Sequence, residues 1–389
     1  MTIAPEHLSP TDRRRNLVAL IVAMTAGSLI YGMSAPLLSL VLDTQGVSEE
    51  LIGFSATAQA LIGVPLAPLF GRLLRAWGPA RPILLGLALT VLTYLLMPIQ
   101  PDVWVWLPLR FVLSIAGGMM WITGEAWVNQ VAEERMRGRI LAFYSMALAA
   151  GGAVGPVALT VVGTAGWPPF LAMAAITAAS AVPVLAVRRR VPAMGGKPAS
   201  GVLGYVRLAP VPILICGVYA VMDGIVMNFL PLYGLRLGLD DAAGLTLLTV
   251  MSLGGIAGQL PAGWLADHVD RNTLVVAAVV VLIGGTAAMP FVMSDPVAGA
   301  VTFFVFGAVR GGLYTVAMVL LGARFQGADL ASASAAFGVF WGLGMVIGPM
   351  LGGVALERAP ETGLPVAIGA LLVAFLPVAL APLVRRRAR

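Results

Sequence analysis

Four ionisable side chains lie well inside long apolar stretches of this sequence. Asp223 interrupts the run GVYAVMDGIVMNFLPLYG, and Arg310 lies inside a second run. Arg110 and Glu125 share a third. A charge at the centre of a lipid bilayer costs about 2.5–3.5 kcal/mol on insertion scales, so such residues face a cavity or an ionic partner. Because burial disfavours the charged form of a carboxylate, Asp223 is a candidate for proton exchange.

The composition of the chain explains why these runs are long. Hydrophobic residues make up 59% of the 389 residues and charged residues only 11%, whereas soluble domains carry roughly 25% charged residues. The mean hydropathy is +0.94. This composition predicts an all-α integral membrane protein, and spans of about 20 residues leave no room for a soluble catalytic domain. We therefore expect no enzyme activity.

Several kinds of site can be set aside. Cys216 is the single cysteine, and His7 and His268 are far apart, so we expect no metal site and no bound cofactor. The sequence has no G-x-x-x-x-G-K-[ST] motif, which argues against ATP as the direct energy source. The polar start is followed by a full-length apolar run, so we expect no removable signal peptide.

Apolar windows bounded by charges and turn residues predict twelve membrane spans. The predicted spans are 16–42, 51–71, 81–99, 104–128, 140–162, 168–187, 210–234, 243–266, 273–294, 297–321, 331–355 and 364–384. The polar segment 188–209 mixes Gly, Pro and Ser with basic residues, as linkers do. It divides the chain into a bundle at 1–187, a cytoplasmic linker, and a bundle at 210–389.

The basic residues predict the orientation. With the N-terminus inside, about 20 Lys and Arg residues fall on the cytoplasmic side, and only Arg236 and Arg358 fall outside. Both termini are therefore expected in the cytoplasm. The basic balance also favours contact with anionic membrane lipid, and no aromatic-interleaved basic patch suggests a nucleic acid partner. We expect a monomer.

The two halves repeat at an offset of about 192 residues, which indicates a duplicated six-helix unit. GRLLRAWGPAR, starting at Gly71, aligns with GWLADHVDRN, starting at Gly263. GAVGP, ending at Pro156, aligns with MVIGP, ending at Pro349. Both matches fall at corresponding spans of the two halves.

These motifs resemble those of the major facilitator superfamily of secondary transporters, along essentially the whole chain. The family carries the loop signature G-x-L-A-D-x-x-G-R after spans 2 and 8. The second copy keeps Gly263, Asp267 and Arg271, with Asp270 where a glycine is usual. The first copy keeps Gly71 and Gly78 but has Arg75 at the acidic position. The resemblance implies that these loops gate transport, with Asp267 and Arg271 as the better candidates.

Span 4 and its loop resemble a narrower group, the bacterial YcaD-like transporters. Glu125, Ala126 and Trp127 form an E-[AS]-W element, and a basic turn follows at Arg135, Arg137, Gly138 and Arg139. The resemblance implies the inner membrane of a bacterium. An antiporter-associated glycine pattern is complete in span 11, at Gly344, Gly348, Pro349, Gly352 and Gly353. Span 5, where antiporters of the family carry it, keeps only part, which weakens an inference of antiport.

The resemblance also implies that spans 1, 4, 7 and 10 line a central cavity between two pseudo-symmetric bundles, and the four internal charges lie in spans 4, 7 and 10. At 1.5 Å per residue, Asp223 and Arg310 each lie about 19 Å from the start of their spans, near the midplane. Two readings remain open for this pair. It couples an ion gradient or touches solute, or it is a permanent structural ion pair.

The remaining candidates are weaker. Arg110 anchors an anionic solute group or bonds to helix carbonyls, and Glu125 is a gate residue or a helix-end carboxylate near basic loops. Uncharged polar candidates for contact with solute are Tyr31, Gln59, Asn228 and Tyr314.

The sequence as a whole predicts a secondary active transporter of a small organic solute, working by alternating access and coupled to protons, in the direction of efflux or uptake. An uncoupled facilitator is the alternative, and a non-transporting sensor or scaffold with the same fold is a third reading.

Overall fold

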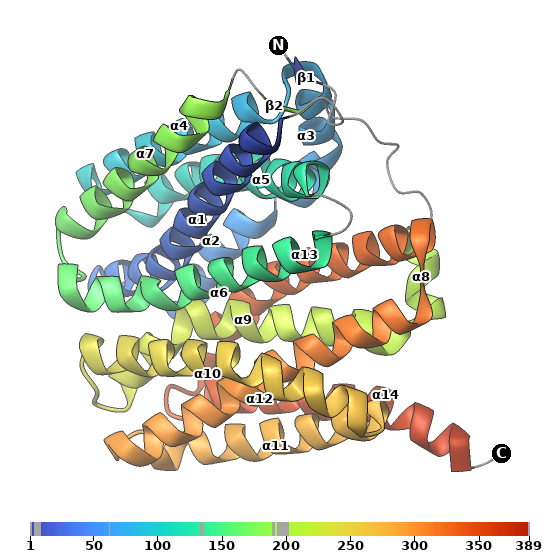
Figure 1. Cartoon of the computed structure of the whole chain (residues 1–389). Coiled ribbons are helices and arrows are strands. Elements are labelled where there is room, and N and C mark those ends of the chain that lie inside the picture. The colour runs from blue at the N-terminus through green and yellow to red at the C-terminus, as the bar shows by residue number, and fades with distance from the viewer. Residues whose placement is uncertain are drawn as a thin grey trace. The chain divides into compact units, whose positions relative to one another are not determined.

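A computed structural model describes residues 2–3, 9–61, 63–132, 136–188, 191–192 and 202–387. Nearly all of these residues lie in helices (Figure 1). A short parallel pair joins β1 (Thr2–Ile3) to β2 (Val191–Pro192). The predicted all-helical membrane fold is confirmed.

Eleven helices in this part of the chain are long and apolar enough to cross a membrane. The remaining predicted span, the second (51–71), is covered by two shorter helices, α2 (Glu49–Leu61) and α3 (Gly63–Trp77), on either side of Ile62. Before the linker, the others belong to α1 (Pro10–Thr44), α4 (Ala80–Leu96), α5 (Val103–Val131), α6 (Arg137–Val162) and α7 (Pro168–Val187). After it they are α9 (Pro210–Arg236), α10 (Asp241–His268), α11 (Arg271–Val292), α12 (Pro296–Arg324), α13 (Gly327–Arg358) and α14 (Gly363–Arg387).

The chain divides into two compact units. The first comprises Met1–Val47 and Ala58–Lys197, and the second comprises Ser48–Thr57 and Pro198–Arg389. The start of α2 thus groups with the second unit. The short helix α8 (Val202–Leu208), inside the predicted linker 188–209, packs on α13.

Helix pairing inside the two units follows one scheme. In the first unit α1 packs on α6, α3 on α5 and α4 on α7. In the second unit the equivalent pairs are α9 with α13, α10 with α12 and α11 with α14. Figure 1 shows α10, α11 and α12 running side by side. This repetition agrees with the internal repeat predicted from the sequence.

Four aspartates cap the starts of long helices. Asp102, Asp240 and Asp295 each accept hydrogen bonds from backbone amides in the first turns of α5, α10 and α12. Asp270, which stands where the family has a glycine, caps α11 in the same way through the amide of Thr273. A side-chain acceptor there satisfies an amide that has no partner in the helix.

Two glycines allow close helix contact beside the internal charges of the second unit. Gly311, next to Arg310 on α12, lies against the backbone of Gly255 on α10, where a Cβ atom would collide with the carbonyl. Gly348 on α13 lies in the same way against Val221 on α9, two residues before Asp223. Close backbone approach through small residues is a common way to pack helices in membranes.

We predict that Gly311→Ala destabilises the protein by about 1–3 kcal/mol, because the added methyl group overpacks the contact between α10 and α12. Gly322 lies on the same helix and faces open space, so Gly322→Ala is a matched control. The control should be neutral or stabilising by up to about 1 kcal/mol, because glycine disfavours helix. Thermal unfolding of the purified variants in detergent measures both effects. Equal changes in the two variants would contradict the packing argument.

Candidate functional site

Asp223 and Arg310 form an ion pair inside the second unit. Nη1 of Arg310 donates to Oδ1 of Asp223 at 2.8 Å. The exposed fractions of the two residues are 7% and 3%. α9 supplies the carboxylate and α12 the guanidinium. The sequence predicted that Asp223 and Arg310 lie at the same depth in the membrane, and in the structure the two side chains are in contact.

A cluster of aromatic rings lies against the guanidinium of Arg310. Its Cζ atom lies 4.7 Å from the centroid of the Tyr219 ring, a cation–π contact. The Tyr219 ring stacks on Trp341 at 5.4 Å and contacts Tyr314 at 5.0 Å. The predicted candidate Tyr314 thus belongs to this aromatic cluster of Tyr219, Tyr314 and Trp341.

Tyr219 was missed from the sequence, although a signal for it exists. It precedes Asp223 by four residues, so both side chains lie on one face of α9. Asn228 lies on the same helix and is 5% exposed, but its Nδ2 donates to the carbonyl oxygen of Gly224 at 2.8 Å. The Asn228 amide is therefore hydrogen-bonded within its own helix, and Asn228 is not part of the aromatic cluster.

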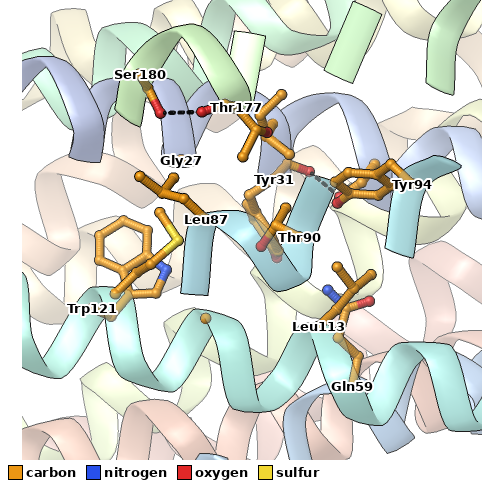
Figure 2. A pocket seen from close by; sticks show the side chains of 14 residues that line it. Gly27, Tyr31, Gln59, Leu87, Thr90, Tyr94, Leu113, Trp121, Thr177 and Ser180 are labelled. Carbon is orange, nitrogen blue, oxygen red and sulfur yellow. Dashed lines mark hydrogen bonds between the residues drawn. The ribbon is translucent and has the colours of Figure 1, made fainter. Parts of the chain in front are cut away.

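The first unit contains a cavity of about 90 Å³ between its helices. Figure 2 shows the side chains that line it, including the predicted candidates Tyr31 and Gln59. The lining residues are Gly27, Ile30, Tyr31, Ser34, Gln59, Leu87, Thr90, Tyr94, Leu113, Gly117, Met120, Trp121, Thr177 and Ser180. Apolar walls with a few hydroxyl and amide groups are typical of small-molecule sites. Four lining residues were not predicted from the sequence, because such residues are common in ordinary helix packing: Thr90 and Tyr94 on α4, and Thr177 and Ser180 on α7.

Arg110 lies beside this cavity and is 1% exposed. Its Nη1 donates to Oε1 of Gln59 at 3.4 Å, a long hydrogen bond. Among the described residues, Nε and Nη2 of Arg110 have no hydrogen-bond partner. Arg110 precedes the lining residue Leu113 by one turn of α5, so both lie on one face of that helix.

The remaining sequence candidates lie toward helix ends. Glu125 is exposed on α5, and Arg139 is exposed near the start of α6. The basic turn that follows Glu125 in the sequence also contains Arg135 and the side chain of Arg137, which lie outside the described residues.

The two loop copies are described unequally. Both Gly71 and Arg75 belong to α3, but the surroundings of Gly71 and the side chain of Arg75 are outside the described part of the structure. Gly78 has a positive φ of 71°, which fits the tight turn between α3 and α4. In the second copy, Asp267 is exposed, Gly263 is partly buried in α10, and Nε of Arg271 donates to the carbonyl oxygen of Ala266 at 3.0 Å. Arg271 thereby caps the end of α10.

A second charge cluster, missed from the sequence, lies in the second unit where α9 ends. Nη2 of Arg236 lies 2.6 Å from Oε1 of Glu49, and the Glu49 amide donates to Oε2 of Glu357 at 2.7 Å. Glu49 precedes the predicted span 51–71. Burial raises the pKa of the Glu49 carboxyl, but hydrogen bonds with Glu357 and Arg236 outweigh burial and leave that pKa below its ordinary value. Glu49 is therefore ionised at neutral pH, and its contact with Arg236 is an ion pair.

Comparison with known structures supports the same fold. A nucleoside transporter NupG (D323A mutant) superposes with a TM-score of 0.78 at 12% identity, covering 94% of this chain and 99% of that one. A bacterial homologue of the human lysosomal transporter Spinster gives 0.74 at 16% identity, with 96% of each chain covered. A D-xylose–proton symporter gives 0.67 at 15% identity, covering 93% and 96%.

Sequence relatives lead to the same family. The uncharacterized MFS-type transporter YfkF of Bacillus subtilis (strain 168) is 25% identical over 365 residues, covering 90% of this chain and 91% of YfkF. YcaD of Escherichia coli O7:K1 is 26% identical over 275 residues, covering 70% and 71%. The profile of the Major Facilitator Superfamily matches residues 19–293 and 213–389. The predicted resemblance is confirmed, and this chain belongs to the Major Facilitator Superfamily of membrane transporters.

Proposed function

We propose that this transporter is a secondary active transporter that moves a small organic solute across the cytoplasmic membrane of a bacterium by alternating access, coupled to protons. The observation that carries the proposal is the buried pair of Asp223 and Arg310 on two helices of an apolar bundle. Intramembrane ionisable residues are expensive and mark solute or ion pathways. Efflux and uptake are both compatible with this pair.

The pair supplies a mechanism for coupling. Asp223 accepts from Arg310 as a carboxylate, and a proton on that carboxylate removes the charge that holds the guanidinium. A buried guanidinium without a partner is strongly unfavourable. Protonation of Asp223 therefore favours a state in which Arg310 finds another acceptor, such as solute or a rearranged helix.

An uncoupled facilitator is the second candidate, and one observation favours it. The ion pair is closed, and the guanidinium of Arg310 also lies over the Tyr219 ring, which holds it in place. In this reading Asp223 stays ionised throughout transport, and the pair only stabilises the second unit.

The proposed orientation places both termini in the cytoplasm, so the loops after predicted spans 2, 4 and 8 face the same side. We assign gating to these loops through Gly71, Arg75, Gly78, Arg137, Arg139, Gly263, Asp267 and Arg271. The hydrogen bond from Arg271 to the end of α10 supports this, because it ties the loop to the helix that carries Asp267. Proton, solute and membrane lipid are the proposed partners, and a monomer is the proposed state.

We predict that Asp223→Asn abolishes proton-driven accumulation but keeps solute exchange. A thermal-shift screen against a metabolite and drug panel first selects a solute, because a bound ligand stabilises the protein by mass action. An imposed gradient of one pH unit supplies about 1.4 kcal/mol per proton, a limit of about tenfold accumulation for one proton per solute. Proteoliposomes carrying wild type should approach that ratio, whereas the variant should only equilibrate.

The control is Asp241→Asn, which changes a carboxylate at the start of α10 and should leave accumulation unchanged. Exchange of labelled for unlabelled solute shows that each variant is folded and active. If solute flux through the wild-type protein does not change with the imposed pH gradient, the result would support the facilitator. Gradient-driven accumulation that persists in Asp223→Asn would remove Asp223 from coupling.

We also predict strong energetic coupling between the two charges. Asp223→Leu or Arg310→Met alone should destabilise the protein by about 3–5 kcal/mol, because each leaves a buried charge without its partner. The double variant should recover most of this loss, since an apolar pair of similar size replaces both charges. Thermal or denaturant unfolding in detergent measures the cycle. Additive losses would show that the two charges do not stabilise each other.

A further inference from the structure

We infer that the cavity of the first unit, with Arg110 and Gln59, is a subsite for a small anionic group, namely the carboxylate of the transported solute. This inference rests on the proposed function, since it names the chemical class of the solute. Its supports are an incompletely bonded buried guanidinium, a cavity that adjoins it and a polar side chain that links the two.

The guanidinium of Arg110 has unused bonding capacity. It carries five N–H donors, and its one recorded hydrogen bond, to Gln59, is 3.4 Å long. Nε and Nη2 have no partner among the described residues, although the residue is 1% exposed. These two nitrogens form one edge of the guanidinium, which matches the two oxygens of a carboxylate.

The two buried arginines differ in the partners of their guanidinium groups. Arg310 is equally buried, but it has a carboxylate at 2.8 Å and an aromatic ring beneath it. Arg110 has neither a carboxylate partner nor a ring contact among the described interactions, so a bound anion would supply the counter-charge that it lacks there. An uncompensated buried charge is costly, so binding of an anion regains stability.

The cavity has the size and lining for the anionic end of a small solute. Its volume of about 90 Å³ corresponds to roughly six to nine water molecules at 10–15 Å³ each. Gln59 both lines the cavity and bonds to Arg110, so the guanidinium lies one hydrogen bond behind the cavity lining. Figure 2 shows Gln59, Thr90 and Tyr94 among the polar lining, with Leu87 and Leu113 as apolar neighbours.

Isothermal titration of the full-length protein in detergent with butyrate and with butyramide tests the inference. The two probes have equal numbers of heavy atoms and differ in charge. Butyrate should bind at least about tenfold more tightly than butyramide, a difference of about 1.4 kcal/mol. Arg110→Gln should remove this preference, and Arg110→Lys should weaken it, because an ammonium group cannot form the two parallel hydrogen bonds.

Two controls separate the subsite from folding and from general charge. Arg72→Gln removes an exposed arginine of the same unit and should leave butyrate affinity unchanged. Gln59→Leu should reduce it severalfold without removing the charge. The melting temperature of each variant without ligand identifies unfolded protein, and if Arg110→Gln does not fold, Arg110→Lys and Gln59→Leu decide the question.

Several results would overturn the inference. Equal affinity for butyrate and butyramide, or an unchanged preference in Arg110→Gln, removes the anionic subsite. Chloride or inorganic phosphate that binds through Arg110 as tightly as butyrate assigns the site to free inorganic anions rather than to solute. Because the titration involves no flux, a protein that binds butyrate through Arg110 but fails the proton-gradient assay keeps the subsite and loses the proposed coupling.

Discussion

The buried ion pair of Asp223 and Arg310 is the constraint on which the second unit depends. Two charges inside an apolar bundle are least costly when they pair with each other at short distance. That distance, 2.8 Å, requires α9 and α12 to stay in register. The glycines beside the pair, Gly311 on α12 and Gly348 on α13, bring neighbouring backbones close enough to hold both helices. The glycine contacts and the ion pair therefore favour the same arrangement of these helices.

The first unit uses the same helix pairing but a different arrangement of charge. Its buried Arg110 lies beside a cavity and bonds only to Gln59 among the described residues. One half thus carries a satisfied charge pair and the other an unsatisfied cation. In the proposed account the first half recognises the anionic end of the solute, and the second half responds to protons. In this proposal, the two copies of one duplicated scaffold serve different chemical tasks.

Sequence patterns predicted the helices well because membrane spans are set by long apolar runs with charges at their ends. The level of Asp223 and Arg310 followed from helical rise, which is why their pairing could be anticipated. Contacts that depend on side-chain direction were not predictable. Tyr219 under Arg310 and the Arg236 contact with Glu49 require the crossing of helices far apart in the sequence. Within the described residues, Nε and Nη2 of Arg110 lack a partner, which depends on three-dimensional packing and is not signalled by any apolar pattern.

The central claim is that Asp223 changes its protonation state when solute binds, releasing Arg310. Difference infrared spectroscopy on purified protein with carbon-13-labelled aspartate reports protonated carboxyl groups directly. The account predicts a labelled carboxylic acid band that appears or disappears when the screened solute is added to wild type, and that is absent from Asp223→Asn. A solute that binds without any such band in wild type would show that Asp223 stays ionised and would contradict the account.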